Sequence, residues 1–405
     1  MQNAKPRSLT RRLPPRLAAL AALALVAAPS LAAAQAKTET KPTWTFASEY
    51  TADVTGVVSG GAARAGRYLD NLSVSLDGDL ERAWGWRGAR LHLSGLYNGG
   101  GEPNALAGTL QGVDNIEVSA QGARLYEAWI EQDLGWGSLL GGLYDLNSEF
   151  YATDASGLLL APPFGIGSEL ASTGPNGPAI FPSTSLAARL RIGNVESFYA
   201  QAAVINADAR TIGDRGGVAT TLDHGVLGIV EVGGRVNGAG RYAVGVWRYD
   251  QHQDDIRDLT PEGEPAQSLA RGAYALAEGR VYGTANPDGP QVDLFGRMGA
   301  SDGDTTDFEG GWQAGVLVSQ VWAGRPDSQV SLGVHQGWLS DKGRANLADA
   351  GDDPAHYEEG LELTYADRIG RFTIQPDVQL IRYAGGLRDA DTVVVVALRV
   401  TTVLF

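Results

Sequence analysis

The chain has 405 residues, of which 54 are glycine and none is cysteine, and its formal net charge is -15. The lack of cysteine excludes disulfide frameworks, thiolate metal sites and thiol nucleophiles. The acidic balance argues against a nucleic-acid binder that relies on a broad basic surface. Gly, Thr, Val, Tyr and Trp recur throughout, which is typical of strands and turns.

The first segment has the composition of an export signal. Residues 1–16 contain five basic residues and no acidic one, and an apolar run from Leu17 to Ala34 follows. Small residues then offer a cleavage site at Ala34-Gln35-Ala36, the order of a secretory signal peptide. We expect residues 1–36 to be a cleaved signal peptide and residues 37–405 to form the mature domain. A retained membrane anchor is the alternative, which a proline inside the apolar run disfavours.

The mature chain alternates apolar and polar residues with a period of two. The clearest segments are 71–77, 89–95, 186–192, 358–365 and 371–380. This period places one set of side chains on each face of a strand. Long strands of this kind, with aromatic residues near their ends, are typical of outer-membrane barrels, whereas a soluble β-protein would need a second layer to cover the apolar faces.

At about 23 residues for a strand and its connection, the mature chain makes ~16 strands. We therefore predict an all-β fold, a transmembrane antiparallel β-barrel of the outer-membrane porin type, in the bacterial outer membrane. The connections alternate in length. Short turns are expected at 135–137, 192–194 and 237–240, and long loops at 98–121, 152–184, 250–270 and 339–356. The loop 152–184 is rich in Gly and Pro, and it either folds into the lumen or stays exposed.

The chain ends in Phe405 after an alternating stretch. A terminal aromatic residue on a last amphipathic strand looks like the insertion signal of outer-membrane proteins. Arg399 has the same parity as Phe405, so we expect a bulge or a cluster of lumen-facing groups near Arg399.

Polar residues on the inward parity are candidates for contact with a solute. A pore that recognises sugars needs planar hydrogen-bonding groups and an aromatic face. On the strand Arg124–Gln132, Glu127, Trp129 and Glu131 are expected to share the inward face, with Tyr126 on the opposite face. On Gly141–Glu149, the polar residues Asp145, Asn147 and Glu149 are expected to share a face. The alternative is that these charges only hydrate the lumen and brace its wall. The pore-lining candidates are Arg90, His92, Glu127, Trp129, Glu131, Asp145, Asn147, Glu149, Arg189 and Arg191.

Several blocks resemble the carbohydrate-selective porin (OprB-like) family: YEAW at 126–129, YDLNSEF at 144–150, FGIG at 164–167, GPNGP at 174–178 and IQPDVQLI at 374–381. The likeness covers nearly the whole mature chain. It implies a 16-stranded barrel through which sugars diffuse passively. The family tends to have Asn-Pro-Gly-Gly after the QPD strand, whereas here Tyr383-Ala384 precede Gly385-Gly386.

The expected function is a passive outer-membrane diffusion channel that prefers mono- or small oligosaccharides. It is not expected to be an enzyme or to hold a cofactor or metal. The alternative is a general or cation-preferring porin, since the mature chain would have 27 basic against 47 acidic residues. A lipid-hydrolysing barrel and a closed structural barrel are more distant alternatives. Expected partners are sugars, outer-membrane lipid and lipopolysaccharide, and the barrel-assembly machinery through Phe405, with a homo-oligomer left open.

Overall fold

A computed structural model describes residues 42–236, 240–283 and 289–405. The expected signal peptide, its cleavage site and most of the turn expected at 237–240 lie outside these described residues.

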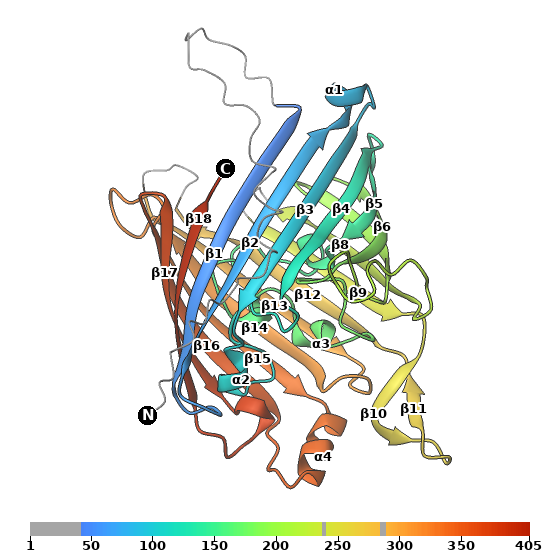
Figure 1. Ribbon diagram of the computed structural model, residues 1–405, viewed down its shortest axis with the longest axis vertical. Helices are drawn as coiled ribbons and strands as arrows, with labels where there is room; N and C mark the ends of the chain where they lie inside the picture. The colour runs from blue at the N-terminus through green and yellow to red at the C-terminus, as the bar shows by residue number, and fades with distance from the viewer. Residues whose placement is uncertain (1–41, 237–239, 284–288) are drawn as a thin grey trace, which may run out of the picture. The chain divides into compact units, whose positions relative to one another are not determined.

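Within the described residues, sixteen strands close into one antiparallel barrel (Figure 1). Chain neighbours pair around the wall, β9 pairs with β12, and β1 closes the barrel against β18. A separate hairpin, β10–β11, projects from the connection between β9 and β12. The strands are β1 (Trp44–Ser59), β2 (Gly66–Asp79), β3 (Ala89–Gly100), β4 (Gly122–Asp133), β5 (Gly137–Tyr144), β6 (Ser185–Gly193), β7 (Phe198–Asn206), β8 (Val226–Val236), β9 (Gly240–Tyr249), β10 (Gln253–Leu259), β11 (Pro265–Ser268), β12 (Arg271–Tyr282), β13 (Gln291–Ser301), β14 (Phe308–Ser319), β15 (Gln329–Leu339), β16 (Tyr357–Ile369), β17 (Phe372–Arg382) and β18 (Val393–Val403). The predicted fold class is confirmed.

Helices in the described part of the chain are short and lie in connections. They are α1 (Leu80–Trp84), α2 (Asn104–Ala107), α3 (Ser168–Ala171), α4 (Asp341–Asp349) and the 3-10 turns η1 (Leu146–Ser148), η2 (Pro162–Phe164) and η3 (Ala384–Gly386). No helix within residues 42–236, 240–283 and 289–405 combines the length and apolarity needed to cross a bilayer.

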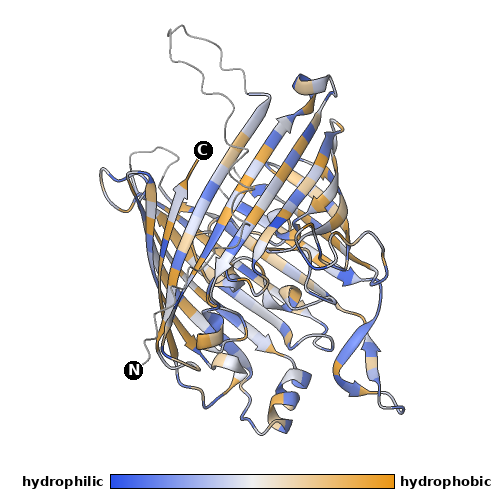
Figure 2. Ribbon diagram, in the orientation of Figure 1, coloured by the Kyte–Doolittle hydropathy of each residue, from blue (hydrophilic) through white to orange (hydrophobic). Residues whose placement is uncertain are grey.

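The strands carry apolar side chains outward, and their inward positions hold most of the polar side chains together with apolar residues such as Ile229 and Trp247. The alternation appears as bands along the strands (Figure 2). On β16, Leu361 and Leu363 are exposed on the outer face, whereas Glu358 and Glu362 are buried inside. Because the period of a strand is two, one sequence supplies both a lipid-compatible wall and a polar lumen. The alternation predicted for these segments is confirmed.

The two ends of the barrel differ in their connections. Short turns join β4 to β5, β6 to β7 and β16 to β17 at the end where β1 begins and the chain terminates (upper end in Figure 1). Residues 101–121, 145–184, 250–270 and 340–356 connect strands at the other end. In bacterial barrels short turns face the periplasm and long loops face outside.

The shared parity of Arg399 and Phe405 has a simple structural reason. Strand β18 ends at Val403, so Phe405 lies beyond it, where its ring packs 6.1 Å from that of Phe46 between centroids. Arg399 faces the lumen and donates to both oxygens of Asp53, at 2.6 to 3.0 Å. The expected cluster of lumen-facing groups is therefore present.

Candidate functional site

Residues 145–184, which we call the inner loop, fold into the barrel between β5 and β6. Leu146, Phe150, Tyr151 and Leu170 are fully buried in it. The alternative that the sequence left open, an exposed loop over 152–184, is therefore wrong. The inner loop begins at residue 145, earlier than predicted, because β5 ends at Tyr144.

Wall carboxylates hold the inner loop by its backbone. Each accepts hydrogen bonds from loop N–H groups, which would otherwise be buried without a partner. The distance from the backbone nitrogen to the carboxylate oxygen is 2.9 Å for Ala155 with Glu278 and for Ala161 with Glu362, and 3.1 Å for Tyr151 with Glu231. The pairs are Glu231 with Tyr151, Glu278 with Ala155, and Glu362 with Leu160 and Ala161. These strands lie on different sides of the barrel, so the loop spans the lumen.

Arg297 on β13 holds the same loop by its carbonyl groups. Its guanidinium donates to the carbonyl oxygens of Tyr151 at 3.0 Å and Gly165 at 2.7 Å, and also to that of Pro163. Gln313 accepts from its Nε at 2.8 Å. A buried guanidinium needs such a full set of acceptors, so Arg297 fixes the loop against β13.

The connection between β3 and β4 also enters the barrel. Glu358 accepts from the N–H groups of Leu110 and Gln111 at 2.8 and 2.9 Å. Asp114 lies beside Asp53 and accepts from the Thr55 hydroxyl at 2.7 Å. Burial, together with the Asp53 carboxylate, raises the pKa of Asp114 to about 7, and Arg399 offsets only part of this.

On β3 and β4 the structure brings three predicted residues into contact. The rings of His92 and Trp129 stack with centroids 5.0 Å apart and planes at 22°. The Trp129 indole N–H donates to Glu127 at 3.1 Å, and His92 Nδ1 lies 2.8 Å from Asp77. An aromatic pair therefore lies among carboxylates on the lumen side of this wall.

Arg189 is the centre of a second group of predicted residues. Its guanidinium donates to Glu131 at 3.0 Å and to Glu149 at 2.7 Å. Arg191 also pairs with Glu149 at 2.6 Å. Burial opposes ionisation of Glu149, but the charges of Arg191 and Arg189 outweigh it and hold the pKa of Glu149 below its usual value.

Asp145 and Asn147 lie in the lumen, but not on a strand as predicted. The alternation expected over Gly141–Glu149 stops at Tyr144, and Asp145 caps the turn η1 by accepting from the N–H of Asn147 at 2.8 Å. Burial raises the pKa of Asp145 to about 7.

The face predicted for Tyr126 is wrong. The register between β3 and β4 shifts between Ser94 and Gly95, which leaves Tyr126 in a bulge. A bulge turns an extra residue out of the alternation. The Tyr126 hydroxyl therefore points inward and donates to Asp145 at 2.7 Å.

The predicted residues differ in how accessible they are. The Arg90 side chain pairs with Glu131 and is 70% exposed, whereas that of Arg189 is 1% exposed. Asp77 is a further accessible lumen group that was not among the predicted residues, and its side chain is 56% exposed. Only the alternation of β2 could have indicated it. Arg189 is thus enclosed by its ion-pair partners, whereas most of the Arg90 side chain is accessible.

The chain of polar contacts continues along the wall beyond the predicted residues. Arg191 Nε donates to Gln201 at 2.9 Å, and Gln201 donates to Glu231 at 3.1 Å. Arg241 lies 3.8 Å from both Glu231 and Glu278. Sequence reasoning missed these residues, because isolated polar residues on apolar strands do not reveal their partners.

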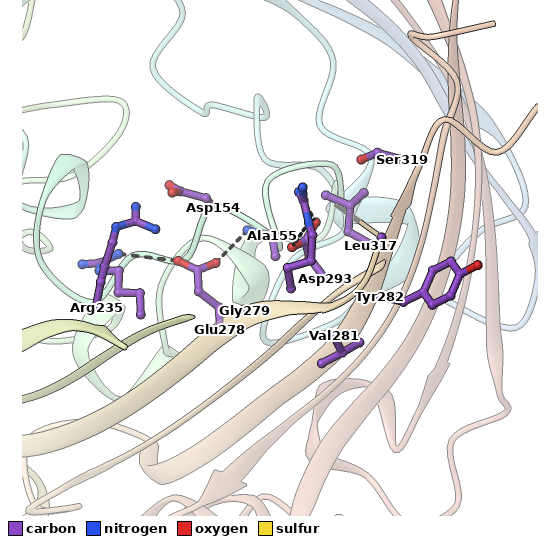
Figure 3. A pocket seen from close by; sticks show the side chains of 13 residues that line it. Asp154, Ala155, Arg235, Glu278, Gly279, Val281, Tyr282, Asp293, Leu317 and Ser319 are labelled. Atoms are coloured by element: carbon purple, nitrogen blue, oxygen red, sulfur yellow. Dashed lines mark hydrogen bonds and ion pairs between the residues drawn. The ribbon is translucent and has the colours of Figure 1, made fainter. Parts of the chain in front are cut away.

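A pocket of about 740 Å³ lies at the short-turn end beside the inner loop. Figure 3 shows Arg235, Glu278 and Asp293 projecting into it, while Tyr282 points away. Arg280 pairs with Asp293 at 2.9 Å. Guanidinium donors and carboxylate acceptors thus both line this pocket beside the inner loop.

Comparisons with known proteins agree with this architecture. A family model described as carbohydrate-selective porin, OprB family, matches residues 63–404. A protein named Porin B from Pseudomonas aeruginosa is 22% identical over 403 residues, covering 88% of this chain and 87% of that protein. The high-pH structure of Pseudomonas putida OprB superposes with a TM-score of 0.78 at 20% identity, covering 89% of this chain and 94% of the other. An anion-selective porin from Comamonas acidovorans gives a TM-score of 0.54 at 14% identity, covering 89% and 99%.

Proposed function

The chain belongs to the carbohydrate-selective porin family and forms an outer-membrane carbohydrate channel, and from that premise we propose that the wall of β2, β3 and β4 is where a passing sugar makes contact. The observation that carries the proposal is the stacked pair of His92 and Trp129, bordered by Asp77 and Arg90. A pyranose ring has an apolar C–H face and a rim of hydroxyl groups. The aromatic pair suits the first, and the carboxylate and guanidinium suit the second.

Contact with these groups is expected to be weak. The Asp77 carboxylate already accepts a hydrogen bond from His92 Nδ1, and Arg90 already pairs with Glu131. A sugar hydroxyl therefore replaces water on groups that keep their protein partners. A channel needs binding that favours entry and still permits release, and pre-paired side chains provide that balance.

The more deeply buried candidates have a supporting role in this proposal. Arg189, Glu131 and Glu149 satisfy one another and hold the start of the inner loop against β4 and β6. Asp145 and Asn147 complete the turn that leads into the loop. They set the position of the wall and loop between which the sugar passes.

The test is single-channel conductance of the refolded protein in a planar bilayer, titrated with glucose and then with maltose. Saturable closure by one of these sugars is expected. Conductance that neither sugar changes would contradict a sugar site and favour the general or cation-preferring porin. Reversal potentials in a KCl gradient then measure the ion preference directly.

We further propose that residues 1–36 are removed on export and that the assembly machinery recognises Phe405. The side chain of Phe405 is 77% exposed beyond the end of β18, which leaves it available during insertion. Deleting Phe405 is expected to slow outer-membrane assembly in cells, measured by pulse-chase of the heat-modifiable barrel, while the conductance of refolded protein stays unchanged. Assembly at the parental rate would contradict recognition of Phe405.

A further inference from the structure

The outer wall carries a groove over β8, β9, β12 and β13, near the long-loop end. Its volume is about 730 Å³, and small residues form its floor: Gly228, Ala273 and Ala300. Val230 and Val246 border it and are 46% and 57% exposed. The groove lies on the outside, because the alternate residues Ile229 and Trp247 are buried within the barrel. An apolar hollow at this position faces lipid rather than the lumen.

Two arginines lie at the end of this groove. Arg248 on β9 and Arg271 on β12 are direct partners in the strand register, and both are exposed. Like charges directly opposite each other on one face of a sheet are destabilising. Within the described residues, neither guanidinium makes an ion pair. The pair therefore presents two guanidinium groups that have no ion-pair partner within the described residues.

The nearby carboxylates are occupied elsewhere. Asp302 accepts from the backbone N–H groups of Arg271 and Asp304, each at 3.1 Å. Asp250 accepts from the N–H of Val226 at 2.7 Å. Asp302 also lines the groove, but both carboxylates accept from backbone N–H groups and neither pairs with a guanidinium in the described part of the chain. The two guanidiniums therefore keep their N–H donors for an external anion.

We propose that this groove binds a phosphorylated glycolipid of the outer leaflet. The arginines lie at the long-loop end, which faces outside in bacterial barrels, at the depth of lipid headgroups. Two adjacent guanidiniums offer several N–H donors in the planar geometry that suits phosphate oxygens. An acyl chain of the same molecule fills the apolar groove over Gly228, Ala273 and Ala300. One ligand thus neutralises the like-charged pair and covers the hollow.

The experiment is native mass spectrometry of the full-length mature barrel in detergent, titrated with bis-phosphorylated lipid A. The test variant is Arg248→Gln/Arg271→Gln. The matched control is Arg215→Gln/Arg388→Gln, which removes two exposed arginines from loops at the same end of the barrel. The test variant is expected to bind lipid A roughly thirtyfold more weakly than the parent, on the basis of about fivefold for each guanidinium near an anionic surface. The control is expected to bind as the parent does.

Further arms separate the headgroup from the acyl chain. Dephosphorylated lipid A is expected to lose most of its affinity for the parent protein, and Ala273→Trp, which fills the groove, is expected to weaken binding while the arginines stay in place. Inorganic phosphate at matched concentration is expected not to compete. Equal binding by the arginine variant, equal binding of the dephosphorylated lipid, or competition by free phosphate would each overturn the proposal. Thermal unfolding of each variant in the absence of lipid verifies that it is folded.

Discussion

At the scale of single residues, the lumen distinguishes groups that a solute can reach from groups that hold the wall together. The exposed Arg90 belongs to the first kind, and the buried Arg189 belongs to the second. Both kinds have the same residue types and the same parity in the sequence. The difference is burial, which depends on the inner loop, and alternation on a strand contains no information about it.

Replacing Trp129 with Ala removes the aromatic face beside His92. We expect the apparent binding constant for the blocking sugar to fall about three- to tenfold, the range of a single aromatic contact, with little change in conductance. The measurement is sugar-induced closure of single channels. Trp136→Ala is the control, because Trp136 lies in a short turn and is 57% exposed. Equal losses in the two variants would contradict a sugar contact at Trp129.

Asp114 makes the stability of the barrel depend on pH. Burial, with the charge of Asp53, raises its pKa in the folded protein to about 7, above the unfolded value of about 3.9. The folded state therefore holds a proton that the unfolded chain has already lost, and the free energy of unfolding falls as pH rises from about 4 to about 7. The fall is limited to about 1.4 kcal/mol per pH unit for one group.

The variant Asp114→Asn isolates this contribution. It is expected to show a weaker loss of stability between pH 5 and pH 8 than the parent, measured by thermal unfolding in detergent. Asp154→Asn, which changes an exposed acid of the inner loop, should keep the parental pH dependence. An identical pH dependence in Asp114→Asn and the parent would be inconsistent with the raised pKa.

At the scale of elements, the strands could be predicted and the inner loop could not. A strand repeats its pattern over ten residues, so errors at single positions average out, and only local features such as the bulge at Tyr126 escape detection. The path of residues 145–184 depends on isolated wall groups such as Glu231 and Arg297, which lie far away in the sequence. Turn-forming residues alone do not reveal whether a loop packs inward or outward. The positions of Asp145 and Asn147 in the lumen follow from a turn rather than from the predicted strand.

Glu362→Gln tests how firmly the inner loop is held. The carboxylate accepts from the N–H groups of both Leu160 and Ala161, whereas an amide has one acceptor oxygen and places an NH2 against the second N–H. We expect hydrogen exchange at residues 158–161 to become about tenfold faster or more, equivalent to about 1.4 kcal/mol, with noisier single-channel current. Glu359→Gln is the control, because Glu359 lies on the same strand as Glu362 but pairs with Arg382 of β17 instead of with the inner loop. Unchanged exchange in Glu362→Gln would show that other contacts suffice.

At the scale of the whole molecule, the membrane and the lumen require opposite surfaces, and the barrel wall provides both with a single layer. Closure of β1 on β18 leaves no unpaired edge among the sixteen barrel strands. The period-two pattern, the connection lengths and the terminal aromatic residue predicted this architecture, because each is a property of the chain itself. The outer groove was not foreseen, since it arises where small residues of β8, β12 and β13 become neighbours.

Leu363 lies near the middle of β16 and is 51% exposed on the outer face. Leu363→Arg is expected to reduce the free energy of unfolding by roughly 2–4 kcal/mol, the effect of a cation at the bilayer midplane. Chemical unfolding in lipid vesicles measures this, with Leu363→Phe as the apolar control. Parental stability of the arginine variant would place Leu363 away from the hydrocarbon core.

The inner loop is also a mechanical tie. It is hydrogen-bonded to four strands of the wall, β8, β12, β13 and β16, through Glu231, Glu278, Arg297 and Glu362. Because these contacts connect separate parts of the wall across the lumen, the loop resists flattening of the barrel. Shortening this segment to widen the channel would also remove the support that keeps the cross-section round. Aperture and stiffness are therefore linked in this molecule, and a larger passage is more safely obtained by trimming exposed lumen side chains that do not contact the inner loop, such as Asp77.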